Sequence, residues 1–500
     1  MKLNSLYLDG YKLLNPFTID FSKDISILIG INGSGKSSVL EAIAQIFSDA
    51  ILKEKSKFGF ILNYNLRLEE VLEQTATSSE FRTDYINVEI SAPEMDHALA
   101  YKVHYKDEIL VKEEEIIEKF NNFQRILPSN IVIYYSGLSD IMKSICEPHD
   151  KVLSKNYRAW NTNVSRPFFY FQPTLFDIIL ISLLSFEFGD VPSFLAEKIK
   201  ISGVQSVQIK LKKPSWSKQK LDKWWGAKGE IKTFLDFLSD RMENTEYLDF
   251  LISKEHPATG NIILEAIADE YLIITIIGRN KLFEIREFFV EERALFKILS
   301  ILVIDGFWDS ATFSLIKEEN SLAASFGVLS EGEQQSVIIK GLMELVTSEN
   351  TLFLFDEPDT FLHPSWQRTF IENVVNFSEK NEPIRSQFLI TTHSPQLLSN
   401  ANYEKAEVQI MENGKMVGIT PKYYGRDIGT ILYEMMGVQE RNKEVTKLIS
   451  NLFNLIEDED LEKAKGEFAS LSSILGSDDP VLIRAKTQLD YLEELKNEAN

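Results

Sequence analysis

The chain reads Gly30-Ile31-Asn32-Gly33-Ser34-Gly35-Lys36-Ser37 where an apolar run gives way to a helical pattern, and this segment decides the fold. It fits the pattern G-x-x-x-x-G-K-[ST], in which glycines let backbone N–H groups turn inward on phosphates. The apolar run 24–30 comes before it, and apolar residues recur at helical spacing after it. The sequence therefore predicts a strand, a phosphate-binding loop and a helix, the core of an α/β nucleotide-binding fold.

The residues of this loop have predicted roles in binding ATP and Mg²⁺. Lys36 is predicted to reach the β- and γ-phosphates and to act in catalysis, and the Ser37 hydroxyl is predicted to bind Mg²⁺. A glycine-rich turn with a surface lysine is the simpler alternative, but the flanking strand and helix favour the phosphate loop. The other residues predicted to contact the nucleotide are Asn32, Gly33, Ser34, Gly35 and Ser38.

Two acids and a histidine follow buried apolar runs further along the chain. Asp356 and Glu357 come after the run 351–355, and His393 comes after the run 386–392. Taken alone, such acids are more often solvated turn residues and such a histidine is more often structural. At the carboxyl edge of a parallel sheet, however, they point into the crevice where ligands bind. We predict that Asp356 holds Mg²⁺, that Glu357 is the catalytic base, and that His393 contacts the γ-phosphate.

A fourth motif opens a predicted helix at 329–335, Leu329-Ser330-Glu331-Gly332-Glu333-Gln334-Gln335. A Ser-x-Gly turn at this place offers a hydroxyl, backbone N–H groups and the positive end of a helix, which together attract an anion. The nucleotide of the same chain already has an anion site in the phosphate loop. We therefore predict that Ser330, Gly332 and Glu333 contact a nucleotide held by a second molecule.

The order of these four motifs resembles that of the ABC-type ATPase heads of SMC, RecF and OLD-family proteins. The likeness covers roughly residues 1–140 and 310–420. It implies that two heads sandwich two ATP molecules, so that Ser330 and Gly332 act on the γ-phosphate held by the other head. The implied protein is an ATPase that works as a homodimer and hydrolyses ATP slowly, as a gate.

Two details separate the chain from parts of this group. Leu362-His363-Pro364 stands where transporter-type ATPases carry an aspartate, which resembles the OLD and RecF side and makes a transporter partner unexpected. A Q-loop glutamine is not found near Tyr134-Tyr135-Ser136-Gly137. The residue that couples the rest of the chain to the γ-phosphate therefore stays unassigned.

Three segments (329–335, 356–364 and 424–432) resemble the ATPase subunit of Septu anti-phage systems, which is found also in some retron systems. This likeness implies a separate HNH-type nuclease as partner and a higher homo-oligomer. The ATPase of PARIS defence systems has a similar head and is the nearest alternative. Two other functions stay open: a RecF- or SMC-like DNA-repair clamp, and an ATP sensor that does not hydrolyse its nucleotide. The chain shows no nuclease motif of its own.

The motifs divide the chain into four predicted parts. The head is split into 1–140 and 310–424, and a mostly helical insertion, 141–309, separates its halves. The tail 425–500 is predicted to form helices at 440–456, 459–475 and 480–497, and to bind the partner. Their amphipathic stripes must be buried, either on the chain's own head or on another protein.

Eight lysines and three tryptophans gather within residues 210–232. This Lys/Trp patch is suited to phosphate contact and base stacking, so it is a candidate DNA contact. The alternatives are a solvated lysine face over packed tryptophans, and a docking surface for an acidic partner. Its eleven residues are Lys210, Lys212, Lys213, Lys218, Lys220, Lys223, Lys228, Lys232, Trp216, Trp224 and Trp225.

The composition favours a soluble cytoplasmic protein. A formal net charge of −22 over 500 residues argues against general adhesion to nucleic acid, so any DNA contact must be local. The single cysteine, Cys146, excludes an intramolecular disulfide and suits a reducing compartment. The longest apolar tract, 168–188, is interrupted by polar residues, so we predict a buried helix there and no membrane contact.

Overall fold

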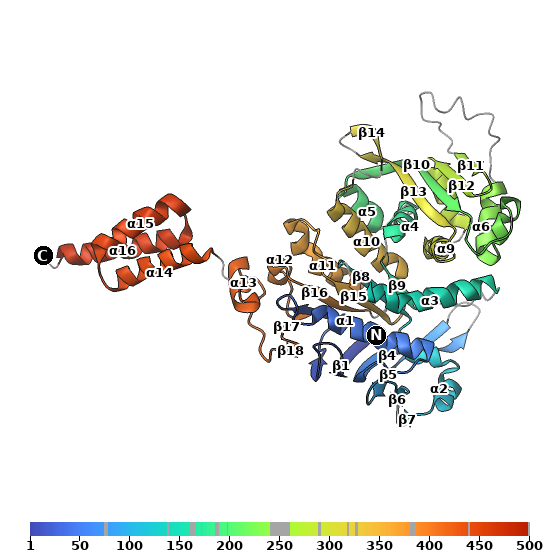
Figure 1. Cartoon of the computed structure of the whole chain (residues 1–500), viewed down its shortest axis with the longest axis horizontal. Helices are drawn as coiled ribbons and strands as arrows, with labels where there is room; N and C mark the ends of the chain where they lie inside the picture. Colours follow the sequence, from blue (N-terminus) through green and yellow to red (C-terminus); the bar gives the residue numbers. More distant parts are fainter. Residues whose placement is uncertain are drawn as a thin grey trace. The chain divides into compact units, whose positions relative to one another are not determined.

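The computed structural model divides into two compact units, residues 1–424 and 425–500 (Figure 1). Each unit is described by itself below. The residues that the structure describes are 1–498 apart from 75–78, 138–139, 160–165, 172, 186–189, 198, 241–260, 289–291, 318–319, 326–328, 381–385 and 439–440.

A seven-stranded central sheet carries the phosphate loop, with strand order β18-β17-β3-β16-β15-β8-β9. All neighbouring pairs are parallel except β17–β18. Every residue of β3, β15 and β16 is buried, as expected for parallel strands covered on both faces. The carboxyl ends of these three strands therefore lie side by side, at the edge where ligands bind in such sheets. The strands are β3 Ile25–Ile29, β8 Asn130–Tyr135, β9 Phe168–Tyr170, β15 Thr351–Asp356, β16 Gln387–Thr392, β17 Ala406–Glu412 and β18 Lys415–Met416.

Helices cover this sheet, as Figure 1 shows. The helix after the phosphate loop, α1, packs against β15 and β16, whereas α10, the helix opened by Ser330, packs against β8. The predicted α/β class with a helical C-terminal extension is confirmed, and the insertion contains the predicted helices together with strands. The helices around the sheet are α1 Lys36–Leu52, α3 Ile141–Arg158, α10 Glu331–Val346, α11 Pro364–Lys380 and α12 Pro395–Ser399.

A six-stranded antiparallel sheet, in the order β2-β1-β4-β5-β6-β7, completes the first part of the head. Its apolar side joins α1 in one hydrophobic core; for example, Phe47 of α1 meets Tyr64 of β4 edge to face. This core anchors the helix that follows the phosphate loop. The strands are β1 Lys2–Asp9, β2 Phe17–Asp20, β4 Gly59–Gln74, β5 Ser79–Ala92, β6 Ala100–Tyr105 and β7 Glu108–Leu110, and two short helices, α2 Glu113–Phe120 and η1 Phe123–Ile126, pack beside them.

The insertion contains the expected helices and also strands that the sequence analysis missed. A third sheet, in the order β11-β12-β10-β13-β14, is antiparallel and combines insertion strands with two strands that follow α9. β12 alternates half-buried and buried residues along its length, the period of a strand. Its residues are nearly all apolar, so this alternation is not visible in the sequence. The strands are β10 Ile201–Lys212, β11 Asn261–Ile267, β12 Tyr271–Ile277, β13 Trp308–Lys317 and β14 Asn320–Ser325.

Five helices of the insertion surround this sheet, together with the short helix η2 Leu221–Gly226. Of the apolar tract 168–188, the described residues form strand β9 and the buried helix α4, as predicted for its helical part, whereas 172 and 186–188 lie outside the described residues. Within the residues described, no helix is both long enough and apolar enough to cross a membrane. The five helices are α4 Pro173–Leu184, α5 Asp190–Glu197, α6 Gly229–Asp240, α8 Arg279–Phe288 and α9 Glu292–Ile304.

In the second unit, the helices of the tail bury their apolar stripes against one another. Its helices are α13 Ile428–Met436, α14 Lys443–Glu457, α15 Leu461–Leu475 and α16 Pro480–Glu498. The last three pack on one another, so neither predicted partner, the head or another protein, is needed to cover these stripes. Their shared core consists of Leu452, Ile456, Ala464, Leu471, Leu482, Ala485 and Leu489. Binding of a partner by this unit stays a prediction.

Candidate nucleotide site

The phosphate loop joins β3 to α1 and is backed by the β17–β18 hairpin. A Cβ atom on Gly30 would lie 2.2 Å from the carbonyl oxygen of Met411, so only glycine fits there. Gly35, directly before α1, has φ +103°, which favours glycine in the same way. The Gly414 N–H donates to the carbonyl oxygen of Ser34 at 3.0 Å. The hairpin therefore fixes the shape of the loop, a role that the sequence analysis did not foresee.

The Lys36 side chain is buried within the curve of this loop. Its Nζ donates to the carbonyl oxygens of Gly30 at 2.9 Å and Ile31 at 3.3 Å. Burial lowers the pKa of Lys36, and the nearby carboxylates of Glu357 and Asp356 oppose that shift. The ammonium group is thus held where phosphate oxygens can replace carbonyl oxygens as acceptors, which suits the predicted contact with the β- and γ-phosphates.

The two predicted magnesium ligands lie in direct contact. The Ser37 hydroxyl donates to Oδ1 of Asp356 at 2.9 Å, and the Thr391 hydroxyl donates to the same atom. Burial raises the pKa of Asp356, and these two hydrogen bonds oppose the rise. One hydroxyl and one carboxylate fit Mg²⁺, which is usually bound by one or two carboxylates together with phosphates and water. Sequence analysis assigned no role to Thr391, although it lies two residues before His393.

Glu357 and His393 meet at the ends of neighbouring strands. Oε1 of Glu357 lies 3.3 Å from Nε2 of His393. The hydrogen bond from His393 is the main cause that lowers the pKa of Glu357, and the charge of Lys36 adds to it. Glu357 has φ +48°, a conformation that costs a non-glycine residue about 1–3 kcal/mol and often marks functional sites. The predicted base is therefore held ionised beside the predicted γ-phosphate sensor.

Ser330 caps α10 and exposes the start of that helix. Its hydroxyl accepts a hydrogen bond from the backbone N–H of Glu333 at 3.3 Å, and the Glu333 carboxylate accepts one from the Ser330 N–H at 2.7 Å. This reciprocal pair is a capping box. Within the residues that the structure describes, the side-chain hydrogen bonds of Ser330 stay in this turn. The signature thus remains available to another molecule.

Two residues fasten α10 to the loop that follows Glu357. A Cβ atom on Gly332 would lie 2.7 Å from the carbonyl oxygen of Phe361, so the helix approaches this loop through a glycine. The Gln335 side chain is buried; its Nε2 donates to the carbonyl oxygen of Pro358 at 2.6 Å, and its Oε1 accepts from the Phe361 N–H at 3.3 Å. The signature helix and the loop after the catalytic acids are therefore linked directly. Gln335 was not assigned a role from sequence.

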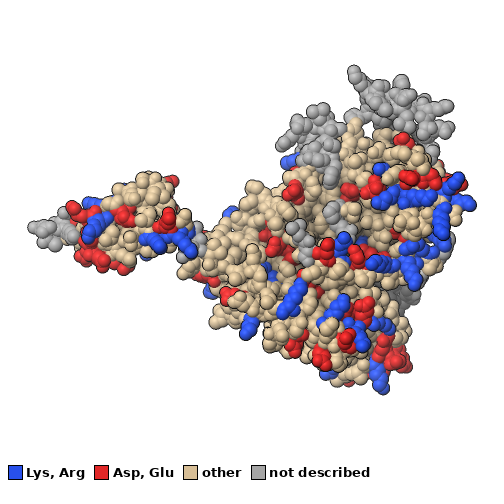
Figure 2. Space-filling model, in the orientation of Figure 1, with Lys and Arg blue, Asp and Glu red and all other residues tan. Residues whose placement is uncertain are grey.

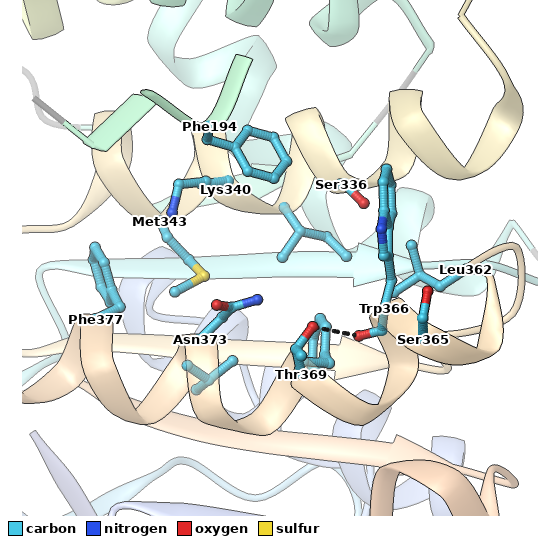
Figure 3. A pocket seen from close by; sticks show the side chains of 13 residues that line it. Phe194, Ser336, Lys340, Met343, Leu362, Ser365, Trp366, Thr369, Asn373 and Phe377 are labelled. Carbon is cyan, nitrogen blue, oxygen red and sulfur yellow. Dashed lines mark hydrogen bonds between the residues drawn. The ribbon is translucent and has the colours of Figure 1, made fainter. Parts of the chain in front are cut away.

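An apolar cavity of about 350 Å³ lies between α10 and α11, with Phe194 of α5 at its margin (Figure 3). Met343 and Lys340 project from α10, and Trp366 and Asn373 project from α11. The cavity opens to solvent between the two helices.

The Lys/Trp patch is held together by its own contacts. Trp225 is fully buried, and its Nε1 donates to the carbonyl oxygen of Asp269. The Nε1 atoms of Trp216 and Trp224 donate to Asp305 and Asp236. Packing of the tryptophans beneath the lysines, one of the predicted alternatives, therefore fits better than stacking of bases on all three rings.

Acidic neighbours also reduce the positive charge of this patch. Lys210 and Lys212 lie 3.3 Å and 3.6 Å from carboxylate oxygens of Asp309. Lys213 and Lys232 have similar carboxylate partners at 3.4 Å and 2.6 Å. Figure 2 shows basic and acidic side chains next to each other at the upper right, near the sheet that contains β10. A DNA contact here remains a proposal that depends on the other four lysines.

The fold and the nucleotide site define a P-loop ATPase of the α/β class. Residues 1–299 match the family model described as "AAA ATPase domain". Residues 212–399 match the model described as "AAA domain, putative AbiEii toxin, Type IV TA system". Since the first match spans 299 of the 500 residues, the chain belongs to the AAA ATPase domain family.

Two curated relatives align with nearly the whole chain. The Retron Ec83 probable ATPase of Escherichia coli is 23% identical over 535 residues, covering 98% of this chain and 87% of the relative. The Retron Vc95 probable ATPase of Vibrio cholerae serotype O1 biovar El Tor is 22% identical, covering 93% of this chain and 86% of the relative. Endonuclease GajA of Bacillus cereus (strain HuB5-5) is 38% identical over 58 residues, which is 11% of this chain and 8% of GajA.

Solved structures give weaker likenesses. The SMC head domain from Thermotoga maritima has a TM-score of 0.31 at 14% identity, covering 84% of this chain and all of that one. A nucleotide-free ATP-binding cassette from an ABC transporter has a TM-score of 0.27 at 12% identity, covering 84% and 90%. The fold description given above therefore rests on the strand order and the motifs of this chain.

Proposed function

We propose that the chain hydrolyses ATP to ADP and phosphate at this site. The contact between Glu357 and His393, beside the Ser37–Asp356 pair, is the observation that carries the proposal. Glu357 accepts the proton of the attacking water, and Lys36 holds the γ-phosphate while its charge develops. Mg²⁺, when bound by Ser37 and Asp356, supplies further positive charge at the phosphates.

Two copies of the chain form the working enzyme in this proposal. Ser330 is exposed at the start of α10, and its hydroxyl accepts a hydrogen bond from Glu333 within its own turn. A helix start of this kind binds anions, so a second chain's γ-phosphate is its natural ligand. A higher homo-oligomer, as the Septu likeness implies, would combine such pairs.

Replacing Ser330 with arginine is expected to block the ATP-driven dimer and leave ATP binding by the single chain intact, because the bulky cation fills the signature turn. Light scattering after gel filtration, with Mg-ATP in a Glu357→Gln background, measures the dimer. Ser144→Arg, at an exposed serine on α3, is the matched control and should dimerise normally. An unchanged dimer fraction in the Ser330→Arg protein would contradict the trans arrangement.

The biological role that we propose is regulation of a separate nuclease in an anti-phage defence complex of the cytoplasm. Both retron ATPase relatives align over more than nine-tenths of this chain, so the likeness extends beyond the nucleotide site. The unit 425–500 has its own core and so can present a surface without disturbing the head. We assign partner binding to this unit and slow, gating hydrolysis to the head.

The test is purification of the tagged full-length chain, and of a version ending at Tyr424, from cells that express it with its genetic neighbours. We expect an HNH-type nuclease with the full-length chain alone, and ATP binding by both versions. A Toprim protein would favour a PARIS-type system, and DNA without a protein partner would favour a repair clamp. A nuclease that is retained by the shortened chain contradicts the assignment of the tail.

A further inference from the structure

A second cavity, of about 460 Å³, lies at the opposite edge of the central sheet from the nucleotide site. It is bounded by α3, β8, β9, α9 and the last turn of α10, elements that Figure 1 shows close together. Asn130, the first residue of β8, lines it and pairs with Thr351 of β15, whereas Asp356 ends β15. Five residues of strand, roughly 16 Å, therefore separate the cavity from the magnesium ligands. The two sites are distinct.

Arg166 forms the inner wall of this cavity and is incompletely satisfied. Its side chain is 10% exposed, and its Nε and Nη2 donate to Asp150 Oδ1 at 3.2 Å and 3.0 Å. Its Nη1 is buried and, in the part of the chain that the structure describes, has no hydrogen-bond partner. A buried donor without an acceptor costs about 1–3 kcal/mol, more when it is charged. This nitrogen can therefore donate a hydrogen bond to an acceptor that enters the cavity.

The charge of the lining selects an anion. Arg166, Arg293 and Lys297 line the cavity, and none of the described lining residues is acidic. The charge of Arg166 is balanced by Asp150, which does not line the cavity, and Glu230 lies 3.6 Å from Lys297. Arg293 is exposed at the mouth and has no ion pair within the described structure. One positive charge is left over, so an anionic group gains both attraction and the unused donor.

The rest of the wall suits a flat apolar group. Phe169 and Phe296 lie with ring centroids 6.1 Å apart and planes at 27°, and Leu153 and Ile301 extend the apolar surface. The hydroxyl groups of Tyr157, Ser300 and Ser348 add polar atoms. Ligand sites of about 300–1,000 Å³ commonly combine an apolar wall with a few such polar groups.

We propose that this cavity binds a nucleoside 5′-phosphate, either free or as the terminal nucleotide of a strand. The Arg166 guanidinium already lies over the Phe169 ring, 4.6 Å from its centroid. The phosphate contacts Arg166, Arg293 and Lys297, and the base lies against the apolar wall that Phe296, Leu153 and Ile301 form. Val346 and Leu345 bring the last turn of α10 into the lining, while Ser330 caps the other end of the same helix. A ligand in this cavity can therefore change the position of Ser330 through α10. This regulatory effect rests on the proposed function, whereas binding of the ligand does not.

The experiment measures binding of two probes to the full-length chain by calorimetry, with the phosphate loop saturated by Mg-ADP. The probes are thymidine 5′-monophosphate and a 5′-phosphorylated thymidine octanucleotide; thymidine and the octanucleotide without its phosphate are the negative controls. Arg293→Ala is expected to weaken binding by about tenfold or more, as for loss of one charged hydrogen bond. Arg368→Ala, at an exposed arginine outside the cavity, should leave it unchanged.

Binding of the mononucleotide supports a free ligand, and binding of the phosphorylated octanucleotide alone supports a strand end. The proposal is overturned if neither probe binds at millimolar concentration, or if the wild type and the Arg293→Ala protein bind equally. Lys297→Gln gives a second reading should the first variant fold poorly, which thermal unfolding reports. Because ADP occupies the phosphate loop throughout, a chain that fails to hydrolyse ATP can still pass this test.

Discussion

Replacing Glu357 with glutamine is expected to stop ATP turnover and to leave ATP binding intact. The amide has the same shape as the carboxylate, but it cannot accept the proton of the attacking water. Loss of a general base typically costs about 10²–10⁴-fold in rate. The hydrogen bond from His393 that lowers the pKa of Glu357 keeps this group ionised near neutral pH. Steady-state phosphate release and fluorescent ATP binding measure the two effects separately.

Glu372→Gln, at an exposed glutamate on α11, is the matched control and should turn over ATP at the wild-type rate. Equal and negligible rates in the wild type and the Glu357→Gln protein would instead favour an ATP sensor that does not hydrolyse its nucleotide. A turnover rate in the Glu357→Gln protein that matches an active wild type would remove Glu357 from the mechanism.

Replacing Lys36 with alanine is expected to abolish ATP binding at concentrations that saturate the wild type. Its Nζ is held by two carbonyl oxygens inside the phosphate loop, so no other side chain can bring a cation to the same point. Loss of charged hydrogen bonds to two phosphates amounts to about 100-fold or more in affinity. Equilibrium dialysis with labelled ATP measures this loss.

Lys55→Ala removes an exposed lysine just beyond α1 and should leave the affinity unchanged. Lys55→Ala should keep the thermal unfolding midpoint of the wild type. Lys36 is buried but lies outside the hydrophobic core, so Lys36→Ala should still fold, and thermal unfolding checks this. An unchanged ATP affinity in the Lys36→Ala protein contradicts the role assigned to the loop.

The parts of the site that sequence predicted are those whose chemistry needs particular residues at short spacing. The phosphate loop between β3 and α1 is one example, and the acids after the continuous apolar run of β15 are another. The assigned roles of these residues stay predictions. The residues that hold these motifs in place could not be predicted from sequence. Met411 and Gln335 act through contacts with parts of the chain that are far away in sequence. Such contacts leave no local pattern in the sequence.

The missed sheet and the tail show two other limits of sequence. In β10, polar and apolar residues alternate from Val207 to Lys212, which is the period of a strand, but the surrounding region reads as mostly helical and the strand was overlooked. In the tail, the helical spacing correctly predicted α14, α15 and α16, but amphipathicity says only that a stripe is buried. Which surface buries it is decided by tertiary packing, here the packing of these helices on one another.

The place of β3 in the central sheet has a consequence for how the protein is made. This strand ends at Ile29, yet its two neighbours, β16 and β17, begin only at Gln387 and Ala406. During synthesis, a fully buried and mostly apolar strand must therefore remain without its sheet partners until most of the chain has left the ribosome. Long-range strand pairing is slow, and unpaired apolar strands favour aggregation. We expect a ribosome-bound chain that stops short of Gly414 to depend on chaperones and to be unable to hold nucleotide.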